Sequence, residues 1–185
     1  MPVIKLQTFI NAPVEQCFDL ARSIDLHLQS MQQHNEQAIA GVTGGLIDLH
    51  ETVTWKARHF GLPFKMTVEL TEMEHANYFV DQMVRGPFKW FRHYHAFQAR
   101  NGGTLMVDEF VFRSPLGLLG KLVDNWLLKD YLHKLLEQRN GVIKQVAEGG
   151  QSYSSSPNVI ARSDSDVATA RLHFKTRAVA THRSQ

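Results

Sequence analysis

Apolar and polar residues alternate in several short runs of this chain, which predicts strands with one buried face each. Residues 3–10 form the first run, and the tripeptide Asn11-Ala12-Pro13 ends it and opens a helix. A second short helix is predicted over about residues 24–31. The apolar positions of the first helix recur at helical spacing, at Val14, Cys17, Phe18 and Ala21.

Residues 36–113 form a series of extended runs separated by turn residues. The Asn-Gly pair at 101–102 is a strong hairpin signal, and the regular spacing of the breaks is typical of an antiparallel meander. About six strands are therefore expected here, after the strand at 3–10. The breaks fall at residues 44–45, 61–63, 75–77, 86–87 and 101–103.

One long helix is predicted over residues 118–147, which contain no proline and carry a broad apolar stripe. It would span about 45 Å and is the only candidate to cover the apolar face of the sheet. Its basic residues, Arg139 among them, are interleaved with acidic ones, so we expect them on a solvated face. The apolar residues 116–120 before it dock the helix or, alternatively, form a portal that makes peripheral contact with a membrane.

Composition sets the outer limits of function. The chain has 185 residues with 43% hydrophobic and 21% charged residues, as in ordinary soluble proteins. Its net charge of +2 gives no reason to expect a nucleic-acid partner, and its single cysteine, Cys17, excludes an internal disulfide framework. Without a signal sequence or a membrane-spanning run, a cytoplasmic protein is expected. Residues 1–148 are predicted to form one domain, and the Gly- and Ser-rich segment 149–185 a disordered tail.

The most informative stretch is YFVDQMVRGPFKWFRHYHAF at residues 78–97, taken together with Asp108. Alternation on its second strand puts Phe91, His93, His95 and Phe97 on one face. Two imidazoles on an otherwise aromatic face are costly to bury unless polar partners satisfy them. This stretch therefore indicates a pocket with a polar element, without naming its ligand.

Four segments together resemble the SRPBCC superfamily, the START-like and birch-pollen-allergen-like proteins, and in particular bacterial members labelled cell-division inhibitor or polyketide-cyclase-like. They are INAPVEQCFDLA at 10–21, ETVTWKARHFG at 51–61, residues 78–97, and VDEFVFRSPLGLLGKLVDNWLLKDYLHKLLEQRNGVIK at 107–144. The resemblance implies an α+β helix-grip fold, a curved antiparallel sheet of about six or seven strands around the long helix. It also implies a cavity for lipids, quinones, polyketides or other hydrophobic molecules.

Alternation along the strands then selects a lining for that cavity, rich in aromatic and thioether side chains with few ionisable groups. To the strand residues we add Trp126 from the apolar stripe of the long helix. The predicted ligand-binding residues are Trp55, Met66, Val68, Phe79, Asp81, Met83, Phe91, His93, His95, Phe97, Met106, Asp108, Phe110 and Trp126.

The His/Asp group has several interpretations. His93 or His95 paired with Asp108 or Asp81 forms a structural hydrogen-bond network, a polar anchor for a ligand, or a general base. A metal site would combine the two histidines with Asp108 or His59, although spacing does not fix three ligands. No cofactor is expected, because nucleotide and phosphate fingerprints are absent.

Three functions follow from these interpretations. The first hypothesis is a carrier or sensor of a small hydrophobic molecule, which would not be an enzyme. The second is a cofactor-independent cyclase or dehydratase that uses His93, His95 and Asp108. The third, an interaction module in envelope or cell-division processes, rests only on the labels of similar proteins.

Overall fold

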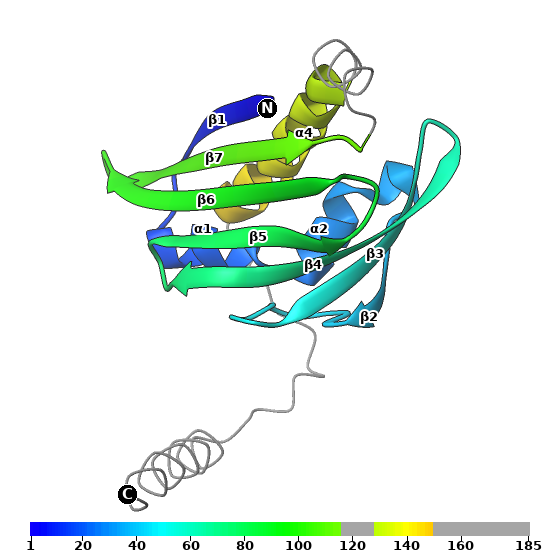
Figure 1. The fold of residues 1–185 in the computed structure, drawn as a ribbon. Helices are drawn as coiled ribbons and strands as arrows, with labels where there is room; N and C mark the ends of the chain where they lie inside the picture. The colour runs from blue at the N-terminus through cyan, green and yellow to red at the C-terminus, as the bar shows by residue number, and fades with distance from the viewer. Residues whose placement is uncertain (116–127, 150–185) are drawn as a thin grey trace, which may run out of the picture. The chain divides into compact units, whose positions relative to one another are not determined.

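A computed structural model describes residues 1–115 and 128–149 of the chain (Figure 1). Its centre is a seven-stranded sheet with the order β1-β7-β6-β5-β4-β3-β2, in which each neighbouring pair is antiparallel. The strands are β1 Val3–Ile10, β2 Gln37–Gly41, β3 Thr52–His59, β4 Leu62–Glu74, β5 Tyr78–Arg85, β6 Trp90–Arg100 and β7 Gly103–Arg113. The predicted meander over residues 36–113 is confirmed.

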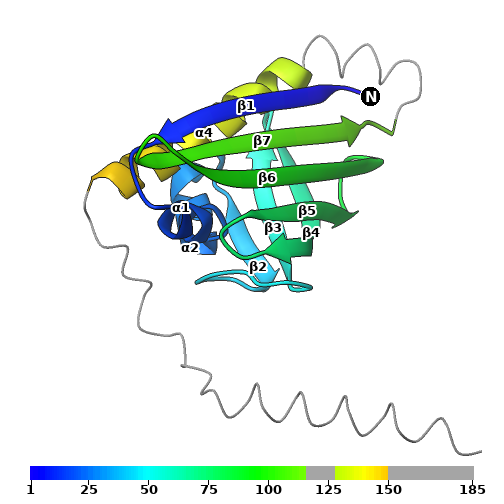
Figure 2. The same ribbon diagram turned by 90° about the vertical axis from the view of Figure 1, so that its left-hand side faces the viewer.

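The helices lie together on one face of the curved sheet (Figures 1 and 2). They are α1 Val14–Ala21, α2 Ile24–Ser30 and α4 Lys129–Glu148, with a 3-10 turn, η1 Gln32–His34, after α2. Helix α4 packs against β1 and against both α1 and α2. Because its partly buried and buried residues recur every three to four positions, one side of α4 covers the sheet. The order of elements confirms the predicted α+β helix-grip arrangement.

Cross-strand register gathers the predicted polar residues at the middle of the sheet. Asp81 on β5 lies opposite His93 on β6, and His95 on β6 lies opposite Asp108 on β7. Directly opposed residues point to the same face of a sheet. The three central strands therefore bring both histidines and both aspartates onto the inner face, beneath the helices.

Helix α1 seals one end of the inner face. The ring of Phe18 packs edge-on against those of Phe79 and Phe97, at centroid distances of 5.6 and 5.4 Å. Beside it, Cys17 has no exposed surface, and burial raises the pKa of its thiol. Thr104, also fully buried, donates a hydrogen bond from Oγ1 to the Ala12 carbonyl at 2.7 Å. Cys17 is thus the small buried hydrophobe that the helical pattern predicts.

Several sequence predictions fall outside the described residues. The first part of the helix predicted over 118–147, the segment 116–120 and Trp126 lie within residues 116–127, and the tail lies almost wholly within 150–185. The described part of the helix ends at Glu148, one residue from the predicted end. Among the residues that the structure describes, no helix has the length and apolar character needed to cross a membrane.

Candidate functional site

A cavity of about 650 Å³ lies between the inner face of the sheet and helices α2 and α4. Its volume falls within the range of about 300–1,000 Å³ that is usual for small-molecule sites. Most of its wall is apolar. Strands β3 to β7 contribute Val53, Trp55, Phe64, Met66, Val68, Phe79, Phe91 and Phe110, and the helices contribute Ile24, Leu132, Leu135 and Leu136, among others.

Eight of the fourteen predicted ligand-binding residues line this cavity: Trp55, Met66, Val68, Phe79, Asp81, Phe91, His93 and Phe110. Five others do not, namely Met83, His95, Phe97, Met106 and Asp108. The fourteenth, Trp126, lies outside the described residues.

The helices explain why four of the five are absent from the wall. Phe97 packs against Phe18 of α1, and Asp108 bonds to Asn140 of α4, so the helices cover this end of the inner face. His95 and Met106, with no exposed surface, are buried in the same region. Alternation identifies the inner face correctly, but it does not show where a covering helix touches that face.

Met83 differs, because its side chain occupies the space beside a glycine at the end of β5. A Cβ atom on Gly86 would come within 2.7 Å of Met83 Sδ and 2.9 Å of Met66 Cγ. The absence of a side chain at Gly86 therefore lets these two methionines pack over the turn. Of the two, Met66 also reaches the cavity wall.

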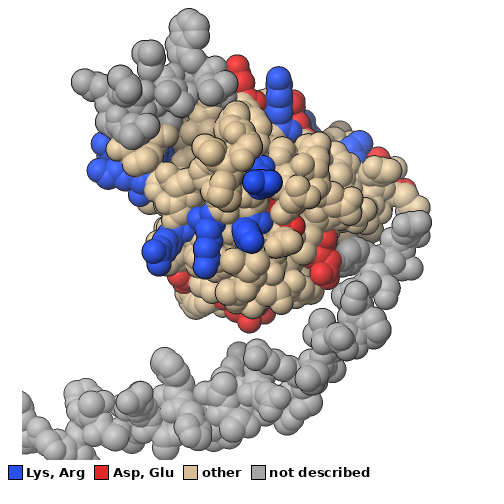
Figure 3. All heavy atoms as spheres, turned by 90° about the vertical axis from the view of Figure 1, so that its right-hand side faces the viewer, with Lys and Arg blue, Asp and Glu red and all other residues tan. Residues whose placement is uncertain are grey.

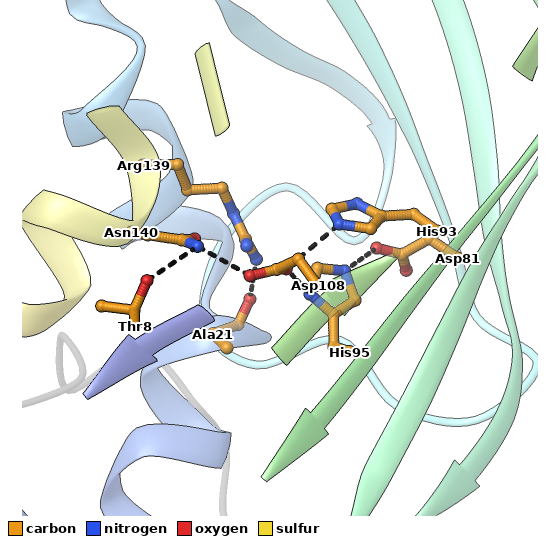
Figure 4. Close-up of polar contacts among 8 residues, drawn as sticks. All are labelled: Thr8, Ala21, Asp81, His93, His95, Asp108, Arg139 and Asn140. Atoms are coloured by element: carbon orange, nitrogen blue, oxygen red, sulfur yellow. Dashed lines mark hydrogen bonds and ion pairs between the residues drawn. The ribbon is translucent and has the colours of Figure 1, made fainter. Parts of the chain in front are cut away.

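A connected polar cluster forms one end of the cavity (Figure 4). His93 Nε2 lies 3.1 Å from Asp108 Oδ1, and His95 Nε2 lies 3.2 Å from Asp81 Oδ2. His95 Nδ1 is only 2.7 Å from Asp108 Oδ1, but the angle is not that of a hydrogen bond. Asp108 thus contacts both imidazoles, whose ring centroids lie 3.7 Å apart, and the four side chains form one polar network.

Burial and close contacts move the pKa values of this cluster in opposite directions. Desolvation, followed by repulsion from His95, lowers the pKa of His93 to about 4, so His93 is neutral at pH 7. Desolvation opposes charge on His95 as well, but its contacts with Asp108 and Asp81 outweigh this effect and raise its pKa. Although burial disfavours their charge, hydrogen bonds from the histidines lower the pKa of both Asp81 and Asp108.

The prediction that Arg139 lies on a solvated face of the helix is wrong. Its side chain is only 7% exposed, and it lines the cavity next to the polar cluster (Figure 4). Arg139 follows Leu135 by four positions and precedes Ile143 by four, so the same spacing that defines the apolar stripe places it inside. Arg139 was expected at the surface because it is charged, although its position in the helix belongs to the buried stripe.

The donor atoms of a metal site also meet in this cluster. One ligand atom from each of Asp81, His93 and His95 lies within 4.8 Å of the other two. The set is completed by Asp81, in contrast to the Asp108 or His59 that we considered from the sequence. Asp108 then stands behind both imidazoles, in the position of a carboxylate that orients metal-binding histidines.

His59 lies at another part of the cavity wall, where it joins the sheet to α4. Its Nδ1 is 2.7 Å from the hydroxyl oxygen of Tyr131, and the Tyr131 ring also packs on Phe60 at 4.5 Å. Phe60 and Leu62 line the cavity and are nevertheless 57% and 61% exposed. The cavity therefore reaches the protein surface at the β3–β4 hairpin.

The architecture resembles that of solved structures with low sequence identity. A START superfamily protein from Mycobacterium smegmatis has a TM-score of 0.61 and 11% identity, over 80% of this chain and 97% of that one. TTHA0849 from Thermus thermophilus has a TM-score of 0.61 and 17% identity, over 77% of this chain and 97% of that one. Major latex-like protein 151 from Panax ginseng has a TM-score of 0.60 and 15% identity, over 79% of this chain and 97% of that one. This chain has the helix-grip fold.

The predicted resemblance to START-like and birch-pollen-allergen-like proteins is thereby confirmed at the level of the fold. No protein-family model and no curated protein sequence matches the chain. Identities of 11–17% carry a fold but no activity. The function of this helix-grip protein must therefore be argued from its own cavity.

Proposed function

We propose that this protein binds a small, largely hydrophobic molecule in its interior cavity and acts as a carrier or sensor. The observation that carries the proposal is the cavity of about 650 Å³ enclosed by the sheet, α2 and α4. Its wall is mainly aromatic and aliphatic, and its few polar groups gather at one end. Such a composition suits an apolar body oriented by a small number of polar contacts.

Adaptable side chains support a ligand of irregular shape. Met31 and Met66 line the cavity from different elements, one from the segment after α2 and one from β4. Methionine has an unbranched, polarisable side chain that fits different surfaces at little cost. The proposed site therefore tolerates related hydrophobic molecules, as a carrier or sensor of lipid-like compounds requires.

The enzymatic alternative uses His93 as a general base oriented by Asp108. The two side chains are in hydrogen-bond contact, and His93 lines the cavity, which favours this role. However, a base works best when its pKa is near the working pH, and that of His93 is about 4. His95 has no exposed surface through which to reach a substrate. Binding without catalysis is therefore the better-supported function.

Surface charge on the face drawn in Figure 3 is of both signs. There, several Lys and Arg side chains lie near one another on one part of the face, and Asp and Glu side chains lie mainly towards its edges. Nucleic-acid binding depends on a concentrated basic surface. Because the chain carries a net charge of only +2, we propose a small-molecule partner rather than a nucleic acid.

Two measurements test the proposed function. Protein purified from its native host and extracted with organic solvent should release a stoichiometric hydrophobic molecule, detected by mass spectrometry. In parallel, the fluorescent apolar probe N-phenylnaphthylamine should bind the delipidated protein at one site. Val68→Trp, which fills the cavity from β4, should weaken binding of that probe by about tenfold or more.

The matched control is Val84→Trp on the neighbouring strand β5. Val84 is 59% exposed and does not line the cavity, so this variant should bind the probe like the wild type. Equal binding by both variants would place the probe on the surface and remove the cavity from the proposal. Circular dichroism of both variants establishes that the fold is kept.

A further inference from the structure

Arg139 on α4 is a buried cation at the wall of the cavity. It is 7% exposed, lies beside the cluster of Asp81, His93, His95 and Asp108, and contributes to the cavity lining. Its positive charge interacts with the cluster and contributes to lowering the pKa values of His93 and Asp81. Burying a charge is costly unless a partner offsets it.

The two terminal nitrogens of the Arg139 guanidinium group differ in their hydrogen bonding. Nη2 donates a hydrogen bond to the Ala21 carbonyl at 2.5 Å, at the carboxyl end of α1, where the helix dipole favours a cation. Nη1 is buried and has no hydrogen-bond partner among the described residues. None of the ion pairs in that part of the chain includes Arg139.

The neighbouring carboxylates are already engaged. Asp108 contacts both histidines and accepts a hydrogen bond from Asn140, and Asp81 contacts His95. In the described cluster, both carboxylates are therefore paired with histidines, and neither is paired with Arg139. A guanidinium with a free N–H beside a cavity is suited to receive an oxygen atom, and a carboxylate gives the strongest such bond.

We propose that the ligand carries a carboxylate at one end, which pairs with the Arg139 guanidinium group while its apolar body lies against the aromatic wall. The ligand class is thus an amphipathic monocarboxylic acid. This inference rests on the ligand-binding function proposed above and narrows it.

The experiment compares two probes with the same apolar chain, dodecanoic acid, which is charged at neutral pH, and its uncharged methyl ester. Each is titrated against N-phenylnaphthylamine bound to the delipidated full-length protein. The wild type should bind the acid about tenfold more tightly than the ester, because only the acid pairs with the guanidinium. Arg139→Met should abolish that preference, and Arg139→Lys should retain part of it.

Arg22 supplies the matched control, because it is the other arginine on the cavity wall. Its guanidinium is already paired with Asp19 at 2.9 Å and with the Ile47 carbonyl at 3.1 Å. Arg22→Met should therefore keep the preference for the acid. A preference lost equally in both variants would show a general effect of charge and overturn the assignment to Arg139.

The outcomes separate this inference from the function on which it rests. If the wild type binds acid and ester equally, or prefers the ester, the carboxylate proposal is wrong while cavity binding stands. If the apolar probe does not bind in the cavity at all, the proposed function itself fails. The comparison of acid with ester on the wild type needs no variant, so it decides the proposal even where Arg139→Met does not fold.

Discussion

Asn140 donates a hydrogen bond from Nδ2 to Asp108 Oδ2 over 2.6 Å, which joins α4 to β7 beneath the cavity. Asn140 is 2% exposed and Asp108 1%, so the contact is shielded from bulk water. We expect Asn140→Ala to lower the free energy of unfolding by about 1–3 kcal/mol, since it leaves a buried carboxylate with one donor fewer. Urea denaturation at pH 7 measures the change.

Lys134→Ala, at an exposed position on the same helix, is the control for lost helical side chains and should change stability by less than about 0.5 kcal/mol. Equal effects of the two substitutions would mean that the contact with Asp108 adds nothing beyond helix propensity. Asn140→Asp should be more destabilising than Asn140→Ala, because it places a second carboxylate beside Asp108.

The two buried histidines predict a stability maximum near pH 6.5. The pKa of His93 is about 4 in the folded protein, so below about pH 6.5 the unfolded chain binds a proton that the folded chain does not. Stability therefore falls as the pH drops from about 6.5 to 4. The pKa of His95 is raised, so its contribution is complete below about pH 6.5 and is lost as the pH rises through its folded value.

Variants separate the two limbs of this profile. His93→Gln should flatten the acid limb, whose slope reaches at most about 1.4 kcal/mol per pH unit, and His95→Gln should flatten the alkaline limb. Val84→Gln, at an exposed and non-titrating position of β5, should leave both limbs unchanged. Denaturation curves at half-unit intervals between pH 4.5 and 8.5 provide the measurement, and an unaltered acid limb in His93→Gln would contradict the assignment.

The contact between His59 and Tyr131 predicts an effect on ligand exchange rather than on affinity alone. It ties β3 to α4 where the cavity reaches the surface. Tyr131→Phe removes the hydroxyl and keeps the ring, so dissociation of N-phenylnaphthylamine should become several-fold faster, with a loss of stability of about 1 kcal/mol. Stopped-flow dilution measures the rate, and an unchanged rate would show that this contact does not control access.

Two glycines with similar backbone angles should respond differently to alanine. Gly41 and Gly61 have φ of +73° and +76°, but a Cβ on Gly41 would lie 2.0 Å from the Thr52 carbonyl oxygen, whereas Gly61 has nothing within 4 Å. Gly61→Ala should cost about 1 kcal/mol for the left-handed conformation alone. Gly41→Ala should cost considerably more, since β2 and β3 must separate. Equal melting temperatures would contradict the close approach.

Sequence periodicity recovered the strands and the inner face because both depend on local alternation. It correctly placed Phe79, Asp81 and His93 on one wall, three residues on two neighbouring strands. It could not separate His95 and Asp108 from that wall, since their burial is decided by a helix more than thirty positions away along the chain. Arg139 was expected on a solvated face, because a charged side chain on a helix is normally solvated.

The accessibility of the Cys17 thiol reports local opening of the protein at helix α1. It is the only thiol in the chain, and its complete burial keeps it from reagents as long as α1 stays docked on β6 and β7. The rate at which an aromatic disulfide labels the native protein therefore measures how often α1 detaches. Since α1 also receives Arg139 at its carboxyl end, an occupied cavity should slow that labelling, so a single absorbance trace can follow occupancy without any attached dye.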